Sequence, residues 1–118
     1  MKLYEDDYIR TKDGIIDKVI IEYNGECNSP NCNRKHVSCE HNYYDEDTII
    51  KSSPNIIDLI EIGDIIITKH PAIEKEYIEP INDETTLELL KKCFEEKSLK
   101  LISILTKEQF EQMKYKIN

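Results

Sequence analysis

The residues best suited to chemistry gather in one short polar stretch, residues 27–41, which holds three of the four cysteines and two of the three histidines. Thiolate and imidazole are ligands that zinc prefers, and structural zinc sites are usually closed and four-coordinate. The stretch has almost no apolar side chains that would fold it by burial. The sequence therefore predicts a structural zinc ion held by four members of the set Cys27, Cys32, Cys39, His36 and His41.

The spacing of these residues favours a first ligand pair. Cys27 and Cys32 flank a short turn with Pro30, and Cys39 offers a third soft thiolate. Spacing alone leaves open whether His36 or His41 is the fourth ligand. Two alternatives carry less weight: a disulfide with one free thiol, and a catalytic zinc, which would need an open position and a general base.

The composition is that of an acidic chain of 118 residues with a net charge of −8. This charge opposes direct binding to nucleic-acid phosphates or to an anionic membrane, and it favours a basic protein partner. No stretch is apolar enough to span a membrane, and the acidic start is unlike a secretion signal. We therefore expect a cytoplasmic protein, in a reducing compartment where cysteines bind zinc more readily than they form disulfides.

The chain otherwise reads as short strands with a few helices. Strands are predicted at residues 8–11, 15–23, 43–44, 48–51, 65–68, 76–79, 99–105 and 115–117. Helices are predicted after Ser53-Pro54, from Thr85 with Glu88 at capping-box spacing, and from Thr106. Together these predict a single α+β domain over residues 1–118, with a zinc-binding loop inserted at residues 26–42. The expected architecture is a small, strongly bent antiparallel sheet of the SH3-like barrel kind with two or three short helices.

Catalytic motifs are missing from the sequence. It has no glycine-rich phosphate loop, no nucleophile elbow and no H-E-x-x-H segment. We therefore expect that the chain is not an enzyme.

An acidic run follows the Cys/His stretch directly. Asp45, Glu46 and Asp47 come after Tyr43 and Tyr44. The simplest interpretation is a solvated face beside ordinary sheet packing. The functional interpretation is a partner-binding surface, in which the carboxylates imitate nucleic-acid phosphates and the tyrosines supply interface area.

Three segments, Tyr8–Ile15, Ser53–Asp64 and Leu105–Glu111, resemble a family of small proteins from Firmicute phages and mobile elements. The resemblance covers both ends and the middle of the chain, and Ser53–Glu61 is its most specific part. Most such proteins have no known function. Some are anti-CRISPR proteins that inhibit the RNA-guided DNA endonuclease of type II-A systems, and at least one of those contains zinc.

The resemblance implies an inhibitor that binds the endonuclease in the cytosol of a bacterial host and blocks the loading of guide or target DNA. We expect it to act as a monomer. Typical relatives have a short hairpin in place of the Cys/His stretch, so no inhibitory residue is carried across. The alternative is a zinc-containing nucleic-acid-binding or regulatory module of a phage, which Arg34-Lys35-His36 favours and the net charge opposes.

Overall fold

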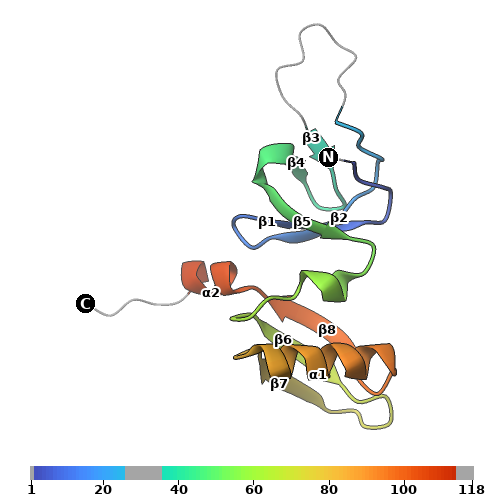
Figure 1. Cartoon of the computed structure of the whole chain (residues 1–118), viewed down its shortest axis with the longest axis vertical. Helices are drawn as coiled ribbons and strands as arrows, with labels where there is room; N and C mark the ends of the chain where they lie inside the picture. The colour runs from blue at the N-terminus through green and yellow to red at the C-terminus, as the bar shows by residue number, and fades with distance from the viewer. Residues whose placement is uncertain (1, 26–35, 114–118) are drawn as a thin grey trace, which may run out of the picture. The chain divides into compact units, whose positions relative to one another are not determined.

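The computed structural model describes residues 2–25 and 36–113 and has an α+β fold. The described strands form three small antiparallel sheets, and two α-helices accompany them (Figure 1). The backbone divides into two units, Met1–Leu59 and Ile60–Asn118, which we describe separately. No described helix is long and apolar enough to cross a membrane. The expectation of a single domain over residues 1–118 stays a prediction.

The first unit holds two of the sheets. Its elements are β1 (Tyr8–Thr11), β2 (Ile16–Lys18), β3 (His36–Ser38), β4 (Tyr43–Asp45), the 3₁₀ helix η1 (Glu46–Thr48), β5 (Ile49–Ser53) and the 3₁₀ helix η2 (Ile56–Leu59). Strand β1 lies between β2 and β5, and β3 pairs with β4 as a hairpin. An isolated bridge between Val19 and Cys39 connects the chain after β2 to the chain after β3.

The first predicted hairpin is confirmed. Strand β1 has the predicted bounds, and Gly14 takes a φ of +80° in the turn before β2. Strand β2 is shorter than the predicted strand over residues 15–23 because its ladder with β1 ends at Lys18. In a strand over residues 15–23, Val19, Ile21 and Tyr23 would share one inward face; Val19 and Tyr23 are buried, but this expectation is wrong at Ile21, which is exposed.

The core of the first unit draws on part of the stretch that we expected to be a loop. Its buried members are Leu3, Ile9, Val19, Tyr23, Val37, Cys39 and Ile49. Residues 36–38 form β3, and alternation along that strand turns Val37 and Cys39 inward. The expectation that residues 27–41 fold without apolar burial is therefore wrong at their described end.

The second unit is one sheet with a helix on it. Its elements are β6 (Ile65–Lys69), β7 (Glu76–Pro80), α1 (Glu84–Glu95), β8 (Lys100–Leu105) and α2 (Lys107–Met113), and the sheet order is β7-β6-β8. Helix α1 runs along the sheet in Figure 1. Its buried residues Leu87, Leu90 and Phe94 recur at helical spacing, so one stripe of the helix faces the core.

The helix starts agree in part with the sequence. Helix α2 is capped by Thr106 as predicted, since the Gln109 amide lies 3.4 Å from Thr106 Oγ1. Helix α1 begins at Glu84 and not at Thr85, because the Asp83 carboxylate accepts from the Thr86 amide at 2.7 Å. The segment after Ser53-Pro54 forms only η2. The predicted strand over residues 115–117 lies outside the described residues.

Candidate functional site

The predicted zinc ligands fall in two groups. Cys27 and Cys32 lie outside the described residues. Cys39, His36 and His41 all lie on or beside the β3–β4 hairpin, where each already has protein neighbours.

Cys39 is a core residue in this structure. It is packed among the apolar side chains of the first unit. Burial, aided by the negative charge of Asp17, raises the pKa of the Cys39 thiol to about 12. Zinc binds the thiolate, so this thiol would have to lose a proton in surroundings that disfavour the charge.

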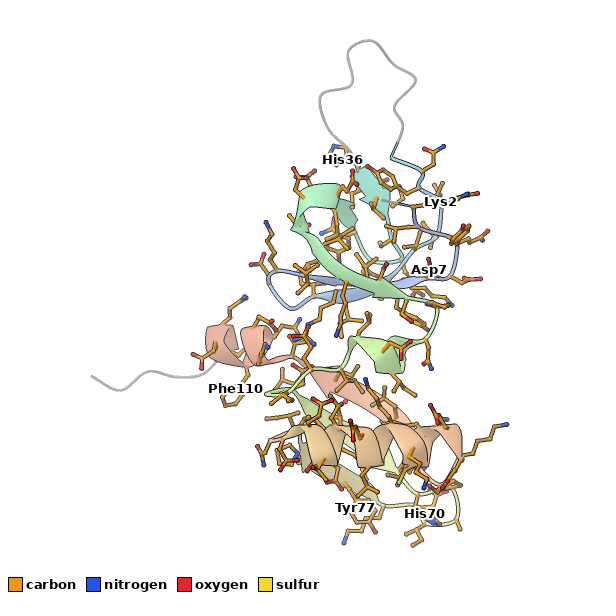
Figure 2. All side chains as sticks on the ribbon, viewed as in Figure 1. Lys2, Asp7, His36, His70, Tyr77 and Phe110 are labelled. Atoms are coloured by element: carbon orange, nitrogen blue, oxygen red, sulfur yellow. The ribbon has the colours of Figure 1, made fainter. Side chains whose placement is uncertain are left out.

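His36 begins β3 and is exposed (Figure 2). Its Nδ1 atom lies 3.1 Å from Oδ1 of Asp45, the residue opposite it in the hairpin register. Alternation along β3 sends this imidazole away from the inward side on which Val37 lies. His36 and Cys39 therefore leave the hairpin in opposite directions.

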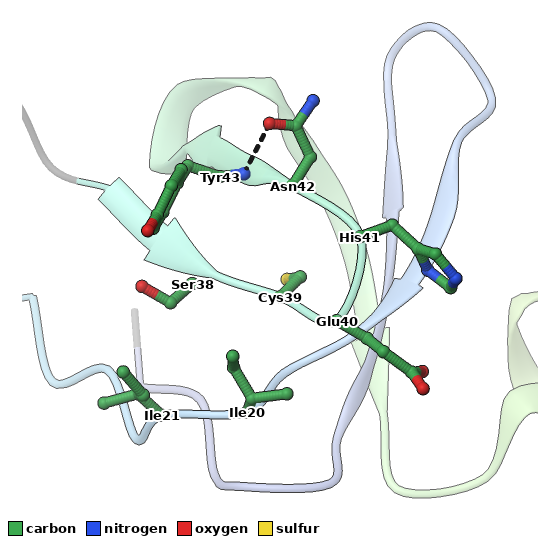
Figure 3. Close-up of a pocket in the computed structure, with 8 residues that line it drawn as sticks. All are labelled: Ile20, Ile21, Ser38, Cys39, Glu40, His41, Asn42 and Tyr43. Atoms are coloured by element: carbon green, nitrogen blue, oxygen red, sulfur yellow. Dashed lines mark hydrogen bonds between the residues drawn. The ribbon is translucent and has the colours of Figure 1, made fainter.

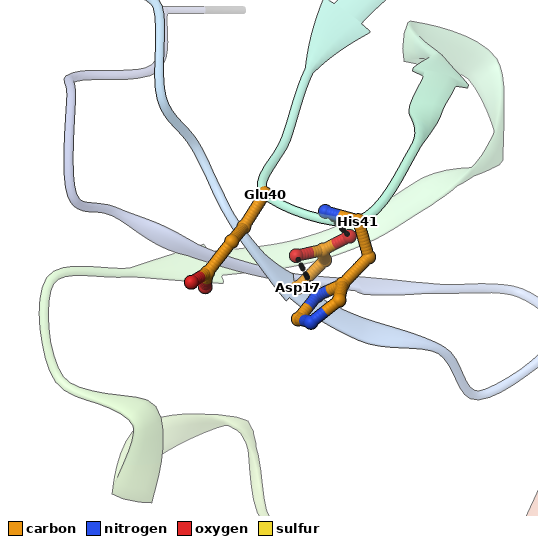
Figure 4. A group of neighbouring side chains, drawn as sticks. All are labelled: Asp17, Glu40 and His41. Carbon is orange, nitrogen blue, oxygen red and sulfur yellow. Dashed lines mark hydrogen bonds and ion pairs between the residues drawn. The ribbon is translucent and has the colours of Figure 1, made fainter.

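His41 lies in the hairpin turn against Asp17 (Figure 4). The His41 side chain is 76% exposed, whereas the Asp17 side chain is only 1% exposed, and His41 Nδ1 lies 3.1 Å from Asp17 Oδ1. A carboxylate only accepts hydrogen bonds, so the Nδ1 atom carries the proton. The hydrogen bond to Asp17 is the main reason why the pKa of His41 is raised above its ordinary value.

The Asp17 carboxylate accepts three hydrogen bonds in addition to its contact with the His41 ring. It accepts from the Lys18 amide at 2.8 Å, from the Tyr44 hydroxyl at 2.9 Å and from the His41 amide at 3.2 Å. Burial is the largest single influence and would raise the pKa of Asp17. The hydrogen bonds together outweigh burial, so the pKa is lowered and Asp17 is ionised at neutral pH.

One group of three donors exists in the part of the chain that the structure describes. Asp17, Glu40 and His41 place one donor atom each within 4.8 Å of one another, and neither Cys39 nor His36 belongs to the group. Two carboxylates and one imidazole suit a divalent cation. The group is one ligand short of a closed site, and Asp17 is already occupied by hydrogen bonds. The full predicted zinc set stays a prediction.

The structure separates the five predicted partner-binding residues. Tyr43 is 71% exposed, and Asp45 and Asp47 are also exposed. Tyr44 points inward and donates to Asp17, and Glu46 accepts from the Tyr23 hydroxyl at 2.6 Å. The outward members are therefore Tyr43, Asp45 and Asp47, while Tyr44 and Glu46 hold the hairpin to the rest of the unit.

A hollow lies beside Tyr43 (Figure 3). Eight residues line it: Ile20, Ile21, Ser38, Cys39, Glu40, His41, Asn42 and Tyr43. Ile20 and Ile21 are exposed large apolar side chains, with 61% of Ile21 accessible. We call Ile20, Ile21 and Tyr43 the apolar patch. Glu40 in the wall of the hollow, and Asp45 two residues beyond Tyr43, give the patch an acidic border.

Only one of these residues has a signal in the sequence. Asp17 occupies the same alternating phase as the buried Val19, which marked it as an inward carboxylate that needs partners. Ile20 and Ile21 are exposed because β2 ends at Lys18, and the sequence has no strand-ending residue at that point. Arg10, which is fully buried and donates to the Leu59 carbonyl at 2.9 Å, also lacked a local signal.

Comparison of the chain with protein-family models, curated proteins and solved structures finds no significant match. The resemblance to small phage proteins therefore rests on the three segments of the sequence alone.

Proposed function

We propose that this chain is a non-catalytic binding protein that captures a basic protein surface through the apolar patch and its acidic border. The supporting observation is the exposure of Tyr43, Ile20 and Ile21 beside carboxylates. Exposed apolar clusters with polar rims are typical of protein–protein interfaces, and tyrosine is enriched at their energetic centres.

The resemblance supplies the identity of the partner in this proposal. The partner is the RNA-guided DNA endonuclease of type II-A systems, whose positively charged channels hold nucleic acid. A body with a net charge of −8 is attracted to such a channel at long range. Occupation of the channel would block the loading of guide or target DNA without any chemical step.

The SH3-like barrel that the sequence led us to expect for residues 1–118 is proposed here for the first unit alone. Three relationships support it: β5 pairs back on β1, the Val19–Cys39 bridge joins β2 to the β3–β4 hairpin, and η1 immediately precedes β5. A bent sheet of this kind would present the hairpin and the chain after β2 on one surface.

The proposal also includes a structural zinc ion. Its support is the donor chemistry of residues 27–41. Cys27 and Cys32 would supply thiolates, and His41 is the better supported histidine. A metal-binding imidazole commonly donates its second ring nitrogen to a carboxylate, and Asp17 is a fixed, buried carboxylate in that position. Zinc bound there would hold the binding surface in one conformation and lower the ordering cost of association.

The test is a pull-down of purified chain by the endonuclease, with and without guide RNA. We expect capture of the wild type, and weaker capture of Tyr43→Ala and Glu40→Lys. The matched control is Glu88→Lys, which makes the same charge change on an exposed face of α1 and should bind normally. Binding to plain duplex DNA with no capture by the nuclease would refute the proposal and favour the nucleic-acid-binding alternative.

A further inference from the structure

Strand β8 is an edge of the sheet in the second unit, and its one charged residue is Lys100 at its first position. In the described chain, β8 pairs with β6 and with no other strand. Its residues Leu101 to Leu105 include no charge, proline or glycine. The opposite edge, β7, carries Glu76, Glu79 and Pro80. Unprotected edges present unpaired backbone amides and carbonyls to other strands.

Residues 101–105 of β8 read the same in both directions about Ser103. It reads Leu101-Ile102-Ser103-Ile104-Leu105. An antiparallel pair of identical strands related by a two-fold axis matches residue i of one copy with residue j of the other, and j with i. With the axis at Ser103, leucine faces leucine, isoleucine faces isoleucine and serine faces serine.

The register with β6 leaves apolar surface on this edge. Ile67 is opposite Ser103 and Thr68 is opposite Leu101, so Ile102 is an extra residue without a partner. A bulge of this kind is one device that guards an edge, but here the bulged residue is apolar and 41% exposed. Ser103 is also exposed, so the centre of the palindrome is accessible.

We propose that two copies of this chain associate through antiparallel β8–β8 pairing centred on Ser103. The pairing joins two three-stranded sheets into one with the order β7-β6-β8-β8-β6-β7. It satisfies the outward backbone groups of both edges and places Ile102 of one copy opposite Ile104 of the second copy. The chain is then a two-fold dimer, in place of the monomer expected from the sequence.

The first test is the mass of the full chain in solution across micromolar to millimolar concentrations, by sedimentation equilibrium. We expect a monomer–dimer equilibrium for the wild type. Ser103→Lys and Ser103→Glu each place two like charges opposite one another, so each should weaken the dimer by about tenfold or more. A wild type that is monomeric throughout, or single variants with unchanged dimerisation, would overturn the proposal.

The second test fixes the register and does not depend on a loss of association. Mixing Ser103→Lys with Ser103→Glu places opposite charges at the axis, so the mixture should form a heterodimer that neither variant forms alone. Ile78→Lys and Ile78→Glu are the matched controls, because Ile78 is exposed on the other edge strand. These controls should dimerise like the wild type, separately and mixed. Failure of the Ser103 mixture to associate would refute pairing centred on Ser103.

Discussion

The imidazole Nδ1 of His41 lies 3.1 Å from Oδ1 of Asp17, so an exposed ring in a hairpin turn is fixed by a carboxylate that solvent hardly reaches. The two residues are 24 positions apart, which makes the contact a tie between the β3–β4 hairpin and β2. Tyr44 and the His41 amide reinforce the same tie through the other carboxylate oxygen.

The first prediction concerns the titration of His41. In metal-free protein, Asp17→Asn removes the negative charge and should lower the pKa of His41 toward its ordinary value of 6.5. Asp45→Asn, which changes the neighbour of His36, should leave the pKa of His41 unchanged. An NMR titration of the imidazole protons measures both. An unaltered His41 pKa in Asp17→Asn would contradict the contact.

The second prediction concerns stability against pH. The folded pKa of Asp17 is lowered from 3.8, so its contribution is present above that value and is lost as the pH falls through the lower folded pKa. The folded pKa of His41 is raised from 6.5, so its contribution is full below 6.5 and is lost as the pH rises through the higher folded pKa.

The contribution of this pair to stability should therefore be greatest between those two ordinary values. Thermal unfolding midpoints of metal-free wild type and Asp17→Asn, measured from acid to mildly alkaline pH, check this. In Asp17→Asn, the unfolding midpoint should depend less on pH than in the wild type, at both the acid and the alkaline end of this range. Parallel profiles for the two proteins would show that the pair does not contribute as we describe.

The parts of the fold that followed from the sequence are those with a local cause. Strand β1 and its turn follow from alternation and from the need for glycine at a φ of +80°. Thr106 is predicted as a cap because Gln109 follows it at capping-box spacing. At α1, the capping-box spacing of Thr85 and Glu88 predicts a start at Thr85, and this prediction is wrong because Asp83, two positions earlier, is the cap.

The candidate site depended on contacts that sequence does not encode locally. Cys39 and His36 look alike as zinc donors, but the pleat of β3 turns one into the core and the other outward. Tyr43 and Tyr44 differ in the same way, because the pleat of β4 turns Tyr43 outward and Tyr44 inward. The placement of each depends on the start of β3, which a composition this polar did not predict as a strand.

The third prediction compares Asp83, which caps helix α1, with Thr85, which the sequence predicted as the cap. Asp83→Ala should destabilise the protein, because the Thr86 amide loses its acceptor. Thr85→Ala should have no destabilising effect, since Thr85 lies inside the helix and is exposed. Urea unfolding of both variants measures the difference. A larger loss for Thr85→Ala would restore the capping box that the sequence suggested.

The fourth prediction concerns the metal. Elemental analysis of purified protein should find one zinc per chain, and the double variant Cys27→Ala, Cys32→Ala should lose zinc and unfold at a lower temperature. Cys93→Ala is the control, because Cys93 lies in α1 outside the Cys/His stretch and should keep its zinc. Full zinc content in the double variant would refute the assigned first pair.

The most direct test of the proposed function is a DNA-cleavage assay with the type II-A endonuclease. Purified chain is added either before guide and target DNA are loaded or after target loading is complete. We predict strong inhibition when the chain is added first, little when it is added last, and less inhibition by Tyr43→Ala at the same concentration. Unchanged cleavage at every order of addition would contradict the account.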